Sequence, residues 1–282
     1  MKYVFNIFLS LIFLFQPLQP VVILVHGSFA QSVAWWRPGG DFFNQIALQA
    51  AQLGHETVPF GWSGNPTEAD ISLSGELLAW LILSYPITER IVLIGHSHGG
   101  NVVTYATQVL HKEIARRLQN EIPDNQTFMD LVATARSDVK AMTPCTQLKP
   151  YLIDKVYLLG APAGVKGCFP QMDVIGSVLN FYSNNDRVQQ VLGLYGRTLA
   201  THDRIANLEV TFTFTRSGKK INQKPGHSDL HNDCIGRWLL QIPEVMAAGS
   251  QGNFENFAFG NGLIDFDCHG CPSYKVKTTP GA

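Results

Sequence analysis

The first chemical feature of this sequence is a serine enclosed by glycines. Ser97 lies in the stretch GHSHGG, residues 95 to 100, which fits the pattern G-x-S-x-G. The β-branched segment RIVLIGHS leads into this stretch, and the helix-forming segment GGNVVTYATQVL follows it. A serine at such a strand-to-helix turn is typical of a nucleophile elbow, where flanking glycines allow a sharp turn. The alternative is that Ser97 only caps the helix.

A serine hydroxyl needs a base, and the base needs an acid to orient it. Asp186 ends the strand-like segment SVLNFYSNND, and His227 lies in the loop segment KPGHSDLHN, after a later strand-like segment. Serine, acid and histidine then follow in the order expected for alternating strands and helices. We predict Ser97 as nucleophile, Asp186 as acid and His227 as base. His231 is the rival base, although we expect it to begin the last helix in a surface or capping role.

Acyl transfer also needs N–H donors for the oxyanion. The backbone N–H of His98, directly after the serine, is predicted to supply one. The second is expected from the loop after the segment VVILVHG, where Gly27 lets the backbone turn inward. The N–H of Ser28 is the predicted donor, and the N–H of Phe29 is the alternative.

Two further histidines flank the serine and the loop. We expect His26 to brace the loop by hydrogen bonding and not to take part in chemistry. His96 and His98, on either side of the serine, invite a metal-ligand interpretation, but adjacent positions of the turn point in different directions and no carboxylate–histidine cluster completes a ligand set. The sequence therefore predicts no metal and no cofactor.

The elements that must position these residues alternate between strands and helices. Strands are predicted at 21–27, 55–62, 90–97, 154–162, 177–186 and 207–215, and helices at 42–54, 69–84, 99–118 and 231–247, the last bent or broken at Pro243. This alternation predicts an α/β fold with a mostly parallel sheet and helices on both faces. Sites in such sheets lie at the carboxyl ends of the strands, where the predicted catalytic residues fall.

Three regions lie outside this alternation. Residues 1–20 form an apolar leader, residues 119–150 form an insertion that could act as a lid, and residues 248–282 read as an irregular tail. The apolar run of the leader is shorter than the about 20 residues that cross a bilayer and has the size of a signal-peptide core. We expect export or membrane association, with a buried core element in a cytoplasmic protein as the alternative, because no small-residue cleavage site is evident.

Composition excludes some function classes. The chain has 282 residues, 45% of them hydrophobic, and a net charge of -1, so it can bury one core but offers no basic surface for nucleic acid. Its five cysteines leave at least one without an intramolecular partner. The stretch CHGC at 268–271 lacks a second pair for zinc. A disulfide is expected if the protein is exported, and unpaired thiols are the alternative.

With these residues in place, the chain resembles the α/β-hydrolase family, in particular its compact lipase- and esterase-like members. The resemblance covers residues 20–247 and is carried by LVHGSF, LIGHSHGG, LLGAP, YSNND and GHSDL. It implies a serine hydrolase that cleaves carboxylic esters through an acyl-enzyme, or an acyltransferase or thioesterase with the same triad. Many members have an antiparallel strand pair before the first of these motifs. Here only the leader precedes it, so a sheet of roughly six strands is expected.

The substrate is predicted only by class, as a small-molecule or lipid ester. Aromatic side chains follow two strand ends and could line an apolar acyl pocket or pack in the core, namely Trp35, Trp36, Phe42, Phe43, Phe60 and Trp62. A catalytically silent, membrane-tethered interaction protein is the least favoured alternative, since it has no need of a complete triad.

Overall fold

The computed structural model describes most of the chain between residues 20 and 276. The described ranges are 20–86, 89–121, 151–163, 168–191, 196–216, 219–249, 261–267 and 270–276. The predicted leader up to residue 19, nearly all of the predicted insertion, and Cys145 and Cys268 lie outside these ranges. Among the described helices, none is both long and apolar enough to cross a membrane.

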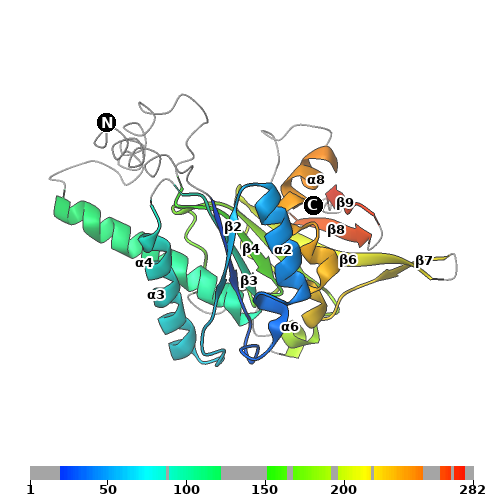
Figure 1. The fold of residues 1–282 in the computed structure, drawn as a ribbon, viewed down its shortest axis with the longest axis horizontal. Coiled ribbons are helices and arrows are strands. Elements are labelled where there is room, and N and C mark those ends of the chain that lie inside the picture. Colours follow the sequence, from blue (N-terminus) through cyan, green and yellow to red (C-terminus); the bar gives the residue numbers. More distant parts are fainter. Residues whose placement is uncertain are drawn as a thin grey trace, which may run out of the picture.

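The described strands form one nine-stranded sheet with the order β2-β1-β3-β4-β5-β6-β8-β9, and β7 pairs with β6 (Figure 1). The strands are β1 (Val21–Val25), β2 (Glu56–Phe60), β3 (Ile91–His96), β4 (Ile153–Leu159), β5 (Ile175–Tyr182), β6 (Ile205–Arg216), β7 (Lys219–Gln223), β8 (Asn261–Asp267) and β9 (Ser273–Val276). All neighbours from β2 to β8 along this order are parallel. Only the β6–β7 and β8–β9 pairs are antiparallel.

The helices lie on both faces of the sheet. They are η1 (Ala34–Trp36), α2 (Asp41–Gln52), α3 (Glu68–Ser84), α4 (His98–Glu121), α6 (Arg187–Val191), η2 (Ser228–His231), α7 (Asp233–Gly236), η3 (Leu239–Gln241) and α8 (Ile242–Gly249). In Figure 1, α3 and α4 lie on one side of the sheet and α2 on the other. The predicted fold class, a mostly parallel α/β sheet covered on both faces, is confirmed, and β1 to β6 are the six predicted strands.

Helices pack on both faces of the sheet because the central strands carry apolar side chains on both faces. Val22 and Leu24 of β1 pack with α2 and the C-terminal helices, whereas Ile23 and its neighbours on the opposite face pack with α3 and α4. Successive strand residues point to opposite faces, so a strand that is covered on both sides must be apolar throughout. This requirement explains why the run VVILV is continuous.

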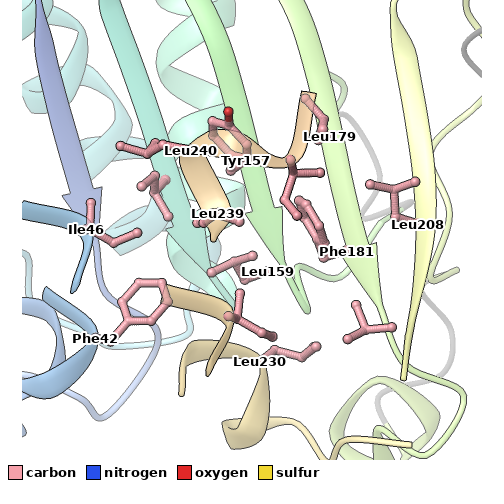
Figure 2. Packing of buried hydrophobic residues seen from close by; sticks show 14 of the residues in the cluster. Phe42, Ile46, Tyr157, Leu159, Leu179, Phe181, Leu208, Leu230, Leu239 and Leu240 are labelled. Carbon is pink, nitrogen blue, oxygen red and sulfur yellow. The ribbon is translucent and has the colours of Figure 1, made fainter. Parts of the chain in front are cut away.

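The cluster on the α2 face also fixes the segment that follows β7. Figure 2 shows side chains of α2, β4, β5 and β6 meeting those of the C-terminal helical segments. Leu230 belongs to this cluster together with Leu159 of β4, and both are fully buried. Burying a leucine stabilises the fold by about 1.5–3 kcal/mol. Leu230 therefore anchors the chain three residues after His227.

The prediction of an irregular tail over 248–282 is wrong for its central part, since β8 and β9 extend the sheet. Ile264 and Phe266 of β8 are fully buried, while Asp265 between them and Leu263 and Asp267 on either side are less so. This alternation is short and lies among glycine and asparagine residues, which are depleted in strands. The exposed edge of β6 supplies the pairing partner that the local sequence does not indicate.

The prediction of one last helix over 231–247 is also wrong. That segment contains the end of η2 followed by α7, η3 and α8, and the interruption does not lie at Pro243. Pro243 is in the first turn of α8, where its missing N–H has no intrahelical acceptor to lose. His231 ends η2 and does not begin a helix, contrary to expectation.

The strand order places a topological switch point at the carboxyl ends of two central strands, β1 and β3. The chain passes from β1 to β2 on one side and then returns to β3 on the other side of β1. At such a reversal the connections leave in opposite directions, and ligands bind in the gap. The loop that carries Ser28 follows β1, and Ser97 follows β3, so both lie at this switch point.

Candidate active site

Ser97 occupies the turn between β3 and α4 in a strained conformation. Its φ angle is 54°, in the left-handed region that residues other than glycine rarely adopt. Its N–H donates to the carbonyl oxygen of Leu159 at 2.9 Å. Such strain costs on the order of 1–3 kcal/mol and persists only where the surroundings impose it. The serine is thus held at the carboxyl end of the sheet by its backbone.

The glycines around Ser97 are required by close packing. A Cβ atom at Gly95 would lie 2.7 Å from the Cα atom of Gly100, and one at Gly99 would lie 2.3 Å from the carbonyl oxygen of His26. Neither distance is tolerated between real atoms, and both neighbours are backbone. The sequence GHSHGG therefore has glycine where the strand, the helix and the β1 loop converge.

Asp186 and His227 form a buried pair at the same end of the sheet. The Oδ2 atom of Asp186 lies 2.7 Å from the Nδ1 atom of His227, and Asp186 is fully buried. The Oδ1 atom accepts a hydrogen bond from the N–H of Gln189 at 3.0 Å. An ionised carboxylate can only accept, so Nδ1 of His227 carries the hydrogen and Nε2 presents a lone pair. This tautomer is the one that a general base requires.

The loops that carry this pair are joined by further side chains. Ser183 Oγ donates to the carbonyl oxygen of Pro225 at 2.6 Å, and Asn185 Nδ2 donates to that of Lys224 at 3.2 Å. Asn184 Nδ2 donates to Glu209 Oε1 at 2.5 Å. With Asp186 on His227, each residue of the stretch SNND contacts the β6–β7 hairpin or the segment that follows it. Sequence reasoning identified Asp186 but missed these supporting contacts, which become visible only once the hairpin forms.

The pair lies close to the backbone of Ser97. A Cβ atom at Gly160, the residue after the Leu159 that binds Ser97, would lie 3.3 Å from both Asp186 Oδ2 and His227 Nδ1. The Nε2 atom of His96 lies 3.2 Å from the carbonyl oxygen of His227. Within the described residues, no hydrogen bond joins the Ser97 hydroxyl to the His227 ring. In ligand-free active sites such bonds are often long and tighten only when substrate binds.

His231 lies nearby but has a different environment. Its ring stacks on Trp35 with centroids 4.1 Å apart and meets the His96 ring edge-on at 4.4 Å. Burial lowers the pKa of His231 to about 4. The Asp186 carboxylate contacts His227 and not His231, so the structure gives only His227 an acid partner among the two candidate bases.

His26 braces the loop after β1, as expected. Its Nδ1 atom lies 2.7 Å from the carbonyl oxygen of Gly27, and its Nε2 atom accepts from the N–H of Trp62 at 3.2 Å. Only the neutral ring with hydrogen on Nδ1 satisfies both contacts, and burial lowers the pKa of His26 accordingly. In a planar trans peptide the C=O and N–H point in opposite directions. Holding the Gly27 carbonyl therefore also sets the direction of the Ser28 N–H.

The hydrogen bonds of the same loop distinguish the two candidate oxyanion donors, the N–H groups of Ser28 and Phe29. The N–H of Phe29 donates to the carbonyl oxygen of Gly64 at 3.0 Å, with φ of Phe29 at 59°, so the alternative donor is occupied. Among the described residues no acceptor is found for the N–H of Ser28. A Cβ atom at Gly27 would lie 2.9 Å from the Cβ atom of Ser97, so this loop packs directly against the serine.

The aromatic residues near the two strand ends mostly support the site from within the core. Trp36, Phe42, Phe43 and Trp62 are buried in the hydrophobic clusters. The rings of Trp36 and Trp62 lie 4.3 Å and 5.7 Å from the ring of His26. The core-packing interpretation therefore holds for these four, and two of them, Trp36 and Trp62, contact the ring of the histidine that orients the Gly27–Ser28 peptide.

Within the described residues, no group of three or more histidine, cysteine, aspartate or glutamate side chains is arranged to hold a metal ion. The five histidines near the site instead contact other groups: His227 contacts the Asp186 carboxylate, His98 a serine hydroxyl, His26 and His96 backbone carbonyls, and His231 the ring of Trp35. What the arrangement offers chemically is a serine, an oriented imidazole and backbone N–H groups, the components of acyl transfer.

No protein-family model matches the chain, and no curated protein matches it. Among solved structures, it is similar to a hydrolase of the α/β superfamily from Xanthomonas campestris pv. campestris, with 14% identity, 79% of this chain and 99% of that chain covered, and a TM-score of 0.37. It is also similar to a cell surface hydrolase from Lactobacillus plantarum, with 11% identity, 90% and 86% covered, and a TM-score of 0.33.

A third similar structure is tomato methylketone synthase I in complex with 2-tridecanone, at 15% identity and a TM-score of 0.29. The match spans 53% of this chain but only 43% of the length of that synthase. Because all these TM-scores lie below 0.4, we base the function on the strand order and the site geometry of this chain alone.

Proposed function

We propose that this protein is a lipase- or esterase-like serine hydrolase that cleaves carboxylic esters through an acyl-enzyme on Ser97. The observation that carries the proposal is the buried Asp186 carboxylate 2.7 Å from Nδ1 of His227, at the strand ends where Ser97 adopts a φ angle of 54°. A fully buried carboxylate is costly unless it has a partner, and here the partner is an imidazole with a lone pair to offer.

In the proposed mechanism, Nε2 of His227 removes the proton of the Ser97 hydroxyl as the oxygen attacks the ester carbonyl. Asp186 keeps the ring in its orientation and stabilises the imidazolium that forms. The leaving alcohol takes the proton from His227. Water then attacks the acyl-enzyme by the same route and releases the acid and Ser97.

The negative charge on the carbonyl oxygen needs donors that are in place beforehand. We assign this role to the N–H groups of Ser28 and His98. The first belongs to the peptide that His26 orients, and the second is in the first turn of α4, where N–H groups have no intrahelical acceptor. Each such donor is worth about 3 to 4 kcal/mol of barrier lowering.

The first test is covalent labelling with a fluorophosphonate probe, followed by mass spectrometry of the labelled peptide. The wild-type protein is expected to be labelled at Ser97, and Ser97→Ala to remain unlabelled and to lose about six orders of magnitude in ester turnover. Ser72→Ala, on the surface of α3, is the matched control and should behave as wild type. Labelling that persists in Ser97→Ala would exclude Ser97 as the nucleophile.

An acyltransferase or a thioesterase would use the same residues, so labelling does not separate them from an esterase. Product analysis does. With an ester substrate and an added alcohol, a hydrolase yields mainly the free acid, whereas an acyltransferase yields the new ester. A higher kcat/KM for a thioester than for the matching oxygen ester would instead favour a thioesterase.

A further inference from the structure

One side-chain hydrogen bond joins the two residues to which we assign the oxyanion donors. Ser28 Oγ lies 2.9 Å from Nδ1 of His98, although the two residues are 70 positions apart in the sequence. Ser28 belongs to the loop after β1, and His98 is the first residue of α4. The contact therefore spans the switch point between β1 and β3.

The other hydrogen bonds of this loop do not reach α4. The Gly27 carbonyl is held by the ring of His26, within the loop itself, and the Phe29 N–H is held by the carbonyl of Gly64, in the segment between β2 and α3. Among the described residues, the Ser28–His98 contact is the hydrogen bond that ties this loop to α4. The loop and the helix each carry one of the two assigned donors, so this contact bridges the two segments that carry them.

We propose that the Ser28 hydroxyl and the His98 imidazole are positioning residues that hold the Ser28 and His98 N–H groups at the spacing a tetrahedral intermediate requires; this inference rests on the function proposed above. Neither side chain takes part in proton transfer. Each acts through the backbone N–H of its own residue.

The chemistry of the two side chains suits a hydrogen bond that is always formed. Burial, aided by the charge of His227, lowers the pKa of His98, so the ring is neutral near neutral pH. A serine hydroxyl donates and accepts, and a neutral imidazole nitrogen does one or the other. The contact is therefore satisfied in both tautomers of His98, whichever ring nitrogen carries the hydrogen.

A hydrogen bond that positions the oxyanion donors should stabilise the transition state more than the bound substrate. Complete loss of one donor lowers kcat by about 10²–10³-fold. Loosening both without removing either should cost less. We expect Ser28→Ala and His98→Ala each to lower kcat by about 10–100-fold and to change KM by less than about twofold.

The test is a double-mutant cycle on ester hydrolysis. If the two side chains act only through each other, Ser28→Ala/His98→Ala should be no slower than the slower single variant. Ser28→Thr keeps the hydroxyl and His98→Asn places an amide near the position of Nδ1, so both should recover most of the lost kcat. Ser32→Ala, an exposed serine in the same loop, is the matched control and should keep wild-type kinetics.

Two outcomes overturn the inference. One is wild-type kcat in both alanine variants. The other is a double variant whose loss equals the product of the two single losses, since the side chains would then act independently. The thermal unfolding midpoint is measured for every variant, and if an alanine variant does not fold, Ser28→Val and His98→Phe, which also lack the hydrogen bond, replace it in the cycle.

The failure of this inference differs from the failure of the proposed function. If wild-type Ser97 does not react with the fluorophosphonate probe, the proposed function fails. If wild-type Ser97 reacts and the two alanine variants hydrolyse ester like wild type, the proposed function stands, but the positioning role of the Ser28 and His98 side chains is refuted.

Discussion

Nδ1 of His227 lies 2.7 Å from Oδ2 of Asp186, although strands β6 and β7 separate the two residues along the chain. The contact is reached because the loop after β5 and the segment after β7 leave the same end of the sheet. The burial of Leu230 then fixes the segment after β7 against the core, and the hydrogen bond from Ser183 to the carbonyl oxygen of Pro225 joins this segment to the loop after β5. The orientation of the imidazole is thus a property of the sheet and its connections.

The first prediction concerns the carboxylate of this pair. In Asp186→Asn the side chain keeps its size, but the amide can donate to Nδ1 and so stabilise the tautomer with hydrogen on Nε2, which cannot accept the serine proton. We expect kcat for a p-nitrophenyl ester to fall by about 10³–10⁴-fold with little change in KM. The control is Asp173→Asn, an exposed aspartate before β5, which should keep wild-type turnover. Equal activity of the two variants would contradict the assignment of Asp186 as the acid.

The second prediction concerns the peptide between Gly27 and Ser28. In His26→Ala the Gly27 carbonyl loses its donor at 2.7 Å, and the peptide is free to rotate. We expect kcat to fall by about 10²-fold, the order found when one oxyanion donor is lost. His26→Asn can place an amide donor near the former Nδ1 position and should recover part of the loss.

The control for this effect is His202→Ala. In the described part of the chain the His202 ring forms its hydrogen bond and ion pair with Arg204 and Asp203 of its own loop, before β6. That variant should keep wild-type kcat. If His26→Ala folds, as judged by circular dichroism, and retains full kcat, the orientation of the Ser28 N–H does not depend on His26.

The third prediction separates backbone strain from crowding. Gly160 has φ of +60°, and a Cβ atom there would lie 2.9 Å from Leu230 Cδ1 and 3.3 Å from the atoms of the Asp186–His227 contact. Gly54 has φ of +73° with nothing within 4 Å of its Cβ position. Alanine at either position should cost about 1 kcal/mol of unfolding free energy, because it forces a side chain into the left-handed region.

Of the two variants, only Gly160→Ala should also lower kcat, since only its methyl group meets the Asp186–His227 pair, to which we assign the acid and base roles. Chemical denaturation and ester kinetics on both variants test this. A Gly160→Ala variant that loses stability as Gly54→Ala does, but keeps wild-type kcat, would show that the pair tolerates displacement.

The sequence allowed prediction of the parts of this molecule that local pattern determines. The continuous apolar runs of β1 and β3 identify strands buried on both faces, and the glycines around Ser97 identify the turn between β3 and α4. The six strands β1 to β6 follow from such patterns. The order of Ser97, Asp186 and His227 along the chain follows from the alternation of strands and helices.

What the sequence did not reveal depends on partners distant along the chain. The stretch GLIDFD became β8 because β6 offers an edge, and no local signal outweighed the glycine and asparagine around it. The bonds of His26 to Trp62, and of Ser28 to His98, link segments 36 and 70 residues apart. Hydrogen bonds of this kind have no periodicity, so they appear only when the sheet has brought the strand ends together.

The last prediction concerns stability at low pH. Burial lowers the pKa of His231 to about 4 from its ordinary value of 6.5. As pH falls below 6.5 the unfolded chain binds a proton at this ring before the folded protein does, so the folded state loses stability through the window from 6.5 down to 4.

His231→Phe keeps a flat ring for the stack on Trp35 and removes the titrating group. Between about pH 7 and about pH 4.5 the wild-type protein should therefore lose about 2 kcal/mol more unfolding free energy than this variant. The buried rings of His26 and His96 destabilise both proteins in the same direction. Because His231 also helps to lower the pKa of His96, the difference between the two proteins reports His231 together with its effect on His96. Urea denaturation of both proteins at the two pH values measures it, and parallel losses would show that His231 is not held neutral by the fold.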